Sequence, residues 1–206
     1  MLYWLADNKM DKNNFNIIIA GAGGQGIVTL VDILANAAFI EGYDVKSSEL
    51  HGLSQRGGTV LTYVRFGEKI FSPLFENGQA DLIIGLDLLE SLRQTVFSSK
   101  KTNIVANKYL MPFIGIIPEK EILDGLEKAQ KNKLYLVPAS EICQKELGKE
   151  VVSGIYLIGY AAYKNIIGLK PESILKAIGK VVPQKYLELN IKAFNLAKNP
   201  LFDNLS

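Results

Sequence analysis

The residues of this chain best suited to binding an anion form a glycine-rich loop near the N-terminus. A run of isoleucines at residues 17–19 leads into a G-x-G-x-x-G pattern, and apolar residues at helical spacing follow it. In this context the first glycine permits a tight turn, the second lets the backbone approach a pyrophosphate, and the third lets the helix pack on the strand. Amide groups at the start of that helix would face the anion. The pattern predicts an anion site, or alternatively a merely structural turn, at Gly21, Gly23, Gly24, Gln25 and Gly26.

A second polar segment, residues 49–59, follows the strand expected next along the chain. Glu49 lies about 20 residues beyond Gly26, where dinucleotide-binding folds place an acid on the ribose hydroxyls. Read alone, this spacing predicts NAD binding. The segment is denser in hydrogen-bond donors than a ribose site requires, and the pair Gly57 and Gly58 indicates a backbone that bends sharply or approaches a ligand closely. Because open α/β sheets bind ligands at the carboxyl ends of their strands, we expect this segment beside the glycine loop.

Two side chains of this second segment could take part in a reaction. His51 is the only histidine, and it could act as an acid–base or hydrogen-bonding group near neutral pH or simply brace the loop. The guanidinium of Arg56 could hold a carboxylate or phosphate, or pair with Glu49 or Asp87. No second histidine or cysteine is available to build a triad or a metal cluster, so a self-contained hydrolase or metalloenzyme is poorly supported.

The composition favours one domain in a reducing compartment. The chain has 206 residues, 48% of them hydrophobic, and its formal net charge of +2 comes without a basic block, so nucleic acid is not an expected partner. Cys143 is the single cysteine, which excludes an internal disulfide and an iron–sulfur cluster, and its apolar neighbours predict a buried core thiol. Residues 1–14 do not resemble a signal peptide, so we expect a cytoplasmic protein. We expect residues 15–206 to form the domain and residues 1–14 to be an extension, either a disordered arm or the product of an upstream start codon.

The elements that position these segments alternate between helix and strand patterns. A helical pattern runs from the glycine loop to Gly42, and a strand is expected around Val45. Alternating side chains predict a strand at residues 59–66, followed by a tight turn and a short returning strand before Pro73. Further strands are expected at residues 80–86, 103–106 and 134–137, and helices at residues 88–96, 119–130 and 140–147.

These patterns predict an α/β, Rossmann-like fold, with a mostly parallel sheet, helices on both faces and an antiparallel hairpin at about residues 59–72. Residues 151–168 are strongly apolar, but they are at the lower length limit for a membrane span and contain Lys164 and Asn165, so we expect a buried or subunit-facing helix and no membrane partner. A last helix at residues 183–197 is too apolar for a free tail. We expect both segments to bury surface against a partner or a second copy, so that the isolated chain forms homo-oligomers.

Several longer motifs carry a family resemblance. They are G-G-Q-G at residues 23–26, S-E-L-H-G-L-S-Q-R-G-G-T-V at 48–60, V-R-F-G at 64–67, S-P-L at 72–74 and A-D at 80–81. In this order they resemble the gamma-type domain of 2-oxoacid:ferredoxin oxidoreductases (the pyruvate/ketoisovalerate group), and N-I-K-A-F at 190–194 resembles the closing signature of that family. The E-x-H-G-x-x-Q-R-G-G string is specific, unlike the glycine loop alone. Within the family the chain is most similar to the small beta subunit of indolepyruvate ferredoxin oxidoreductases.

The resemblance implies a non-autonomous subunit of a complex that oxidatively decarboxylates a 2-oxoacid of the indolepyruvate or arylpyruvate type, with coenzyme A taking the acyl group and ferredoxin the electrons. Thiamine diphosphate, magnesium and iron–sulfur clusters would belong to a larger partner subunit, and this chain would bind no metal. Coenzyme A would be a substrate ligand, and His51 and Arg56 would support the reaction at the partner's site. The cofactor-binding residues would be Gly21, Gly23, Gly24, Gln25, Gly26, Glu49, Gln55, Gly57 and Gly58.

Two other functions are open on the sequence alone. One is an independent NAD(P)-binding Rossmann oxidoreductase, suggested by the glycine pattern and Glu49. The other is an assembly module without catalytic residues, in which the two loops form only an interface.

Overall fold

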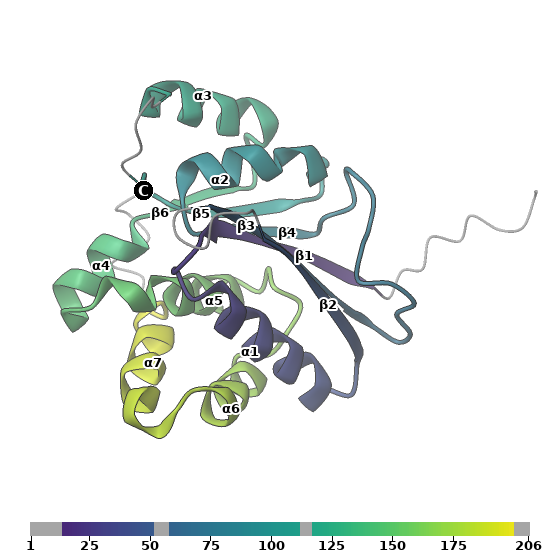
Figure 1. Cartoon of the computed structure of the whole chain (residues 1–206), viewed down its shortest axis with the longest axis vertical. Helices are drawn as coiled ribbons and strands as arrows, with labels where there is room; N and C mark the ends of the chain where they lie inside the picture. The colour runs from purple at the N-terminus through teal and green to yellow at the C-terminus, as the bar shows by residue number, and fades with distance from the viewer. Residues whose placement is uncertain (1–13, 52–57, 112–116, 200–206) are drawn as a thin grey trace, which may run out of the picture.

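The fold is a six-stranded β-sheet with helices on both faces (Figure 1). The computed structural model describes residues 14–51, 58–111 and 117–199, and it describes His51 by its backbone alone. The strands are β1 (Phe15–Ala22), β2 (Asp44–His51), β3 (Thr59–Gly67), β4 (Leu82–Gly85), β5 (Asn103–Asn107) and β6 (Leu134–Val137), in the sheet order β2-β3-β1-β4-β5-β6. This architecture confirms the predicted fold class. The interpretation of residues 1–14 as an extension lies, apart from Asn14, outside the described residues.

Two layers of helices cover the sheet (Figure 1). One face carries α2 (Leu88–Arg93), the short 3-10 helix η1 (Gln94–Phe97) and α3 (Glu119–Ala129). The other face carries α1 (Ile27–Ile40), α4 (Ala139–Leu147), η2 (Glu150–Val152), α5 (Ser153–Tyr163), α6 (Pro171–Val181) and α7 (Gln184–Leu196). Helix α6 was not predicted from the sequence, whereas the other helices and the strands β4, β5 and β6 lie close to their predicted positions.

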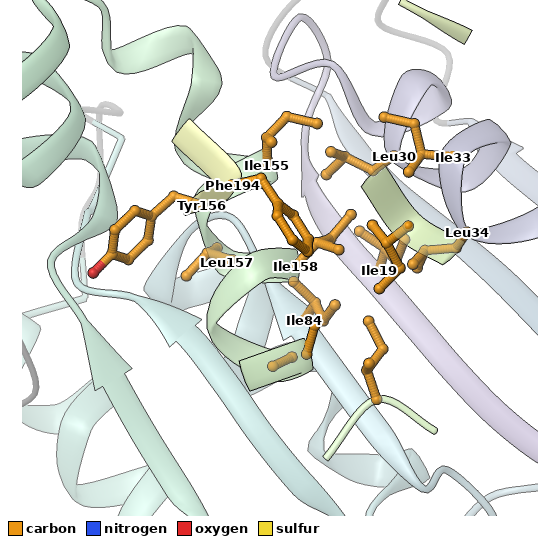
Figure 2. Packing of buried hydrophobic residues seen from close by; sticks show 14 of the residues in the cluster. Ile19, Leu30, Ile33, Leu34, Ile84, Ile155, Tyr156, Leu157, Ile158 and Phe194 are labelled. Carbon is orange, nitrogen blue, oxygen red and sulfur yellow. The ribbon is translucent and has the colours of Figure 1, made fainter. Parts of the chain in front are cut away.

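Strand β1 lies inside the sheet and is buried on both faces. Ile17 and Ile19 belong to the larger hydrophobic cluster, under α1 and α5, while Ile18 and Ala20 belong to the smaller cluster, under α2 and α3. Because successive side chains of a strand point to opposite faces, a strand covered on both sides has a continuous apolar sequence. Each fully buried isoleucine contributes about 1.5–3 kcal/mol to folding. Figure 2 shows part of the larger cluster, with Ile19, Leu34, Ile84, Ile158 and Phe194 packed together.

Strand β3 is the antiparallel strand of the sheet, and its partners differ from the prediction. It lies between β1 and β2 and runs antiparallel to both, whereas β1, β4, β5 and β6 are parallel. The predicted return strand before Pro73 is wrong, because residues 68–72 form no strand. Both edges of β3 are already hydrogen-bonded, so a third strand has no edge to join. The amide of Ile70 instead donates to a carboxylate oxygen of Asp44, with a distance of 2.8 Å.

The apolar segments near the C-terminus pack inside the chain. Residues 154–162 of α5 are all buried, and Phe194 of α7 is fully buried against α5. The prediction of a buried helix in residues 151–168 is therefore confirmed, although much of the apolar surface assigned to a partner is covered by this chain itself. Val151 and Tyr186 remain exposed. Among the described residues, no helix has the length and hydrophobicity needed to cross a membrane.

Candidate functional site

The two polar segments predicted from the sequence meet at the carboxyl end of β1. Ala22 and Thr59 are register partners, and the amide of Gly23 donates to the carbonyl oxygen of Gly58 with an N···O distance of 2.9 Å. His51, the last residue of β2, is the register partner of Val60. The second segment therefore ends beside the glycine loop, as expected, whereas it begins on β2, which β3 separates from β1. Gln55, Arg56 and Gly57 lie outside the described residues, and so does the side chain of His51.

The side chain of Gln25 holds the glycine loop in shape. Its Oε1 accepts a hydrogen bond from the amide of Ala22 at 2.7 Å, and its Nε2 donates to the carbonyl oxygen of Leu86 at 3.4 Å. A Cβ atom on Gly21 would lie 2.5 Å from that Oε1. Gly21 is thus required by the close approach of Gln25, because any side chain there would displace the glutamine.

The N-terminus of α1 leaves backbone amides available for an anion. Gly26 is the N-cap residue, with φ of 77°, and no side chain of the described residues caps the helix. The amides of Ile27, Val28 and Thr29 have no carbonyl partner within the helix, as in the first turn of any α-helix. The amide of Gly23 differs, because Gly58 already occupies it. The amides left available at this loop are therefore those of the first turn of α1, where the helix dipole would favour an anion.

A pocket of about 450 Å³ opens beside these amides, between α1, α5 and α7. Gln25, Gly26 and Thr29 line one side of it, and most of the remaining wall is apolar. Lys149 supplies a positive charge at its lining, and Tyr186, which is half-exposed, belongs to the wall formed by α7. A ligand with an anionic group and an apolar arm would match the helix terminus and the pocket together.

On the other face of the sheet, α2 contributes a polar cluster that the sequence reasoning missed. Arg93 Nη1 lies 2.6 Å from Oε1 of Glu90 and donates to the Thr59 hydroxyl at 2.9 Å, and that hydroxyl lies 3.1 Å from the same Oε1. Glu90 is 5% exposed. Burial raises the pKa of the Glu90 carboxyl above its ordinary value, although Arg93 and Thr59 oppose the shift and Asp87 adds to it. The only sequence signal for this cluster was the acidic Glu90 three residues before the basic Arg93 on a predicted helix.

Asp87, one of the partners considered for Arg56, is engaged elsewhere. Its Oδ1 accepts from the amides of Leu89 and Glu90 and so caps α2, and its Oδ2 accepts from the amide of Met111 at 2.7 Å. This is the usual function of an aspartate at a helix N-terminus.

Glu49 does not occupy the position of a ribose-binding acid. It lies within β2, paired in register with Thr62 of β3, and is partly buried. In dinucleotide-binding folds the strand that carries this acid is the neighbour of the strand that leads into the glycine loop. Here β3 separates the two strands, which places Glu49 about 10 Å from β1 at ordinary strand spacing. The strand order therefore argues against the NAD interpretation.

A mixed α/β sheet with a glycine loop, a helix terminus and a pocket at one edge is typical of ligand-binding α/β domains. Comparison with known proteins identifies its family. The family model described as pyruvate ferredoxin/flavodoxin oxidoreductase matches residues 16–199. The indolepyruvate oxidoreductase subunit IorB of Pyrococcus horikoshii is 32% identical over 188 residues, which cover 88% of this chain and 93% of that protein. The chain belongs to the pyruvate ferredoxin/flavodoxin oxidoreductase family, as its motifs indicated.

Solved structures of related proteins have the same fold. The pyruvate oxidoreductase subunit PORC of Thermotoga maritima matches with a TM-score of 0.67 and 21% identity, over 91% of this chain and 96% of that one. A 2-oxoglutarate:ferredoxin oxidoreductase of Magnetococcus marinus, solved with 2-oxoglutarate, coenzyme A and succinyl-CoA, matches with a TM-score of 0.67 and 21% identity. That match covers 91% of this chain but 31% of the longer one. The fold thus occurs both as a separate subunit and as part of a longer polypeptide.

Proposed function

We propose that this chain is the small, non-autonomous subunit of a cytoplasmic 2-oxoacid:ferredoxin oxidoreductase of the indolepyruvate or arylpyruvate type. The observation that carries the proposal is the match to IorB along nearly the whole of both chains. In the reaction, the bond between the keto carbon and the carboxylate breaks, carbon dioxide leaves, and the acyl carbon forms a thioester with the sulfur of coenzyme A. A pair of electrons passes to ferredoxin, and a proton is released.

The redox cofactors of such a reaction belong to a larger partner subunit. Cys143 is the single cysteine and is fully buried. Within the described residues, no group of three or more His, Cys, Asp and Glu side chains could hold a metal ion. These residues do not fit an iron–sulfur cluster, which needs several thiolates. The chain's contribution to the complex is therefore the binding and orientation of a substrate.

Coenzyme A is the substrate that this sheet edge suits. Its diphosphate would accept hydrogen bonds from the amides of Ile27, Val28 and Thr29, and Lys149 would add a positive charge. The neighbouring pocket of about 450 Å³ would take the less polar arm that carries the thiol. Coenzyme A is bound in the structure of the Magnetococcus protein, whose fold is similar. The backbones of His51 and Gly58 lie at the carboxyl ends of β2 and β1, respectively, and His51 and Arg56 would support the reaction at the partner's centre.

Anaerobic reconstitution with a candidate large subunit from the same organism tests the proposed function. The complex should oxidise arylpyruvates only when coenzyme A and ferredoxin are present, and each subunit alone should be inactive. Branched 2-oxoacids, assayed in parallel, define the substrate type. Recovery of the tagged chain without a large partner, from native cells under anaerobic and low-salt conditions, would contradict the proposal.

The NAD(P) interpretation has a direct test. Isothermal titration of the isolated chain with NAD and NADP should give no heat of binding, because β3 separates Glu49 from the glycine loop. Micromolar binding of either dinucleotide would instead favour an independent dehydrogenase.

A further inference from the structure

The cluster of Thr59, Glu90 and Arg93 lies at the same sheet edge as the glycine loop but on the opposite face from the pocket. Thr59 is the first residue of β3 and the register partner of Ala22, which ends β1. Helix α2, which carries Glu90 and Arg93, packs on the face away from α1 and α5 (Figure 1). The guanidinium of Arg93 reaches the edge, because its Nη1 lies within hydrogen-bond distance of the Thr59 hydroxyl.

The carboxylate of Glu90 lies in an environment that is energetically unfavourable for a charged group. Its side chain is 6% exposed, and both Arg93 and Thr59 contact the same oxygen, Oε1. The other oxygen, Oε2, is buried and accepts no hydrogen bond from any residue that the structure describes. A buried acceptor without a partner destabilises a fold, and removing the carboxylate of Glu90 from water has a cost that the half-exposed Arg93 only partly offsets. Stability alone therefore does not account for Glu90, whereas a role in holding Arg93 does.

Arg93 is the exposed member of the cluster. Its side chain is 51% exposed, although one nitrogen, Nη1, is fixed by both Glu90 and Thr59. An arginine held at one nitrogen still presents donors on the other side of its planar fork, and that fork matches a phosphate or carboxylate. Because the side chain is already fixed before binding, it loses less conformational entropy when the anion binds.

We propose that Arg93, positioned by Glu90 and Thr59, binds a phosphate or carboxylate group of a small-molecule substrate at the carboxyl edge of the sheet. The identity of the substrates rests on the proposed function, so the anion is either a phosphate of coenzyme A or the carboxylate of the 2-oxoacid. Glu90 is a positioning residue, which acts through Arg93.

The test compares variants in the reconstituted complex, after the activity of the wild-type complex has been measured. Arg93→Gln should raise the KM for one of the two anionic substrates by about 10-fold or more, the effect of losing hydrogen bonds to a charged group. The substrate that is affected identifies the source of the anion. Lys128→Gln, on the neighbouring helix α3 and exposed, is the matched control and should leave both KM values unchanged.

A double-mutant cycle separates positioning from a general effect on folding. Glu90→Gln should raise the same KM as Arg93→Gln, but it should add nothing in a chain that already carries Arg93→Gln. An equal effect of Glu90→Gln in both backgrounds would overturn the positioning role. If Arg93→Gln leaves both KM values within about 2-fold of wild type, the proposal is wrong.

Three further outcomes are also decisive. A folded Arg93→Gln chain that no longer assembles would assign Arg93 to the subunit interface and overturn the proposal. If Arg93→Gln does not fold, Arg93→Lys keeps the charge without the fork, and an unchanged KM in that variant counts against the proposal. An inactive wild-type complex would contradict the proposed function alone. In that case, titration of the chain with coenzyme A and with phenylpyruvate decides the inference: weaker binding by Arg93→Gln supports it, and equal or absent binding overturns it.

Discussion

The backbone amide of Gly23 donates a hydrogen bond to the carbonyl oxygen of Gly58, with 2.9 Å between the nitrogen and the oxygen. This bond continues the β1–β3 ladder beyond the Ala22 and Thr59 pair and joins the two glycine-bearing segments of the site. It also removes one amide from the set that could bind an anion. The geometry of the anion site is therefore set by strand pairing as well as by the glycine pattern.

Gly21→Ala should destabilise the protein by about 1–3 kcal/mol, the usual cost of overpacking a well-packed site. The new Cβ would lie 2.5 Å from Oε1 of Gln25 and 3.0 Å from Cβ of Leu86. Urea unfolding measures the change. Gly179→Ala is the control, because this glycine lies within α6 and, outside its own helical turns, no atom of the described residues lies within 4 Å of its added Cβ. It should stabilise the protein by about 0.5–1 kcal/mol, and equal effects of the two substitutions would contradict this reasoning.

Gln25→Ala should destabilise the protein by about 1–3 kcal/mol, because the buried amide of Ala22 loses its acceptor. The substitution should also weaken binding of coenzyme A, since the loop that leads into α1 loses its brace. Urea unfolding and calorimetric titration of the complex measure the two effects. Gln144→Ala, on the exposed face of α4, should change stability by less than about 0.5 kcal/mol. An unaltered midpoint for Gln25→Ala would show that the brace is dispensable.

The sequence predicts the buried strands well because their burial leaves a local pattern. β6 was expected at residues 134–137 and has those bounds, and the apolar run at residues 80–86 contains β4. The partners of β3 were not predictable in this way, because alternation shows that a strand is half-buried but not which strands lie beside it. Helix α6 has local signals of its own, Pro171 in its first turn and apolar residues at helical spacing such as Ile174 and Ile178.

The same distinction holds for the candidate site, of which one part was predictable from the sequence and another was not. The glycine loop was predictable because its chemistry lies in consecutive residues. The cluster on α2 was not, because Glu90 and Arg93 form an ordinary i, i+3 pair until the fold brings Thr59 to them. The positions of Gln55, Arg56 and Gly57 are outside the described residues, so their roles stay predictions.

The stability of the wild-type protein relative to Glu90→Gln should fall as the pH rises. Burial raises the pKa of Glu90 above its ordinary value of 4.5, so folding favours the protonated acid. That contribution is fully present below the unfolded-state pKa and is lost as the pH rises through the higher folded-state pKa. Urea unfolding of both proteins across this range measures the difference. A difference that is constant or has the opposite slope would contradict the prediction.

Glu188→Gln is the control for this pH dependence, with the opposite sign. The ammonium of Lys192 lies 2.7 Å from Glu188 and lowers the pKa of that exposed carboxyl. The wild-type advantage over Glu188→Gln should therefore be present above the ordinary pKa and be lost as the pH falls. Because both side chains are largely exposed, added salt should reduce this difference.

The thiol of Cys143 should be inert in the folded protein. The side chain is fully buried, and burial raises the pKa of the thiol to about 12, so little of the reactive thiolate exists at pH 8. Because Cys143 is the single cysteine, an aromatic disulfide reagent reports on it without ambiguity. Reaction in native buffer should be about 1000-fold or more slower than in urea, since the thiol is reached only when the core opens. Native and unfolded protein reacting at similar rates would show that the helix α4 opens locally, and would remove Cys143 from the stable core.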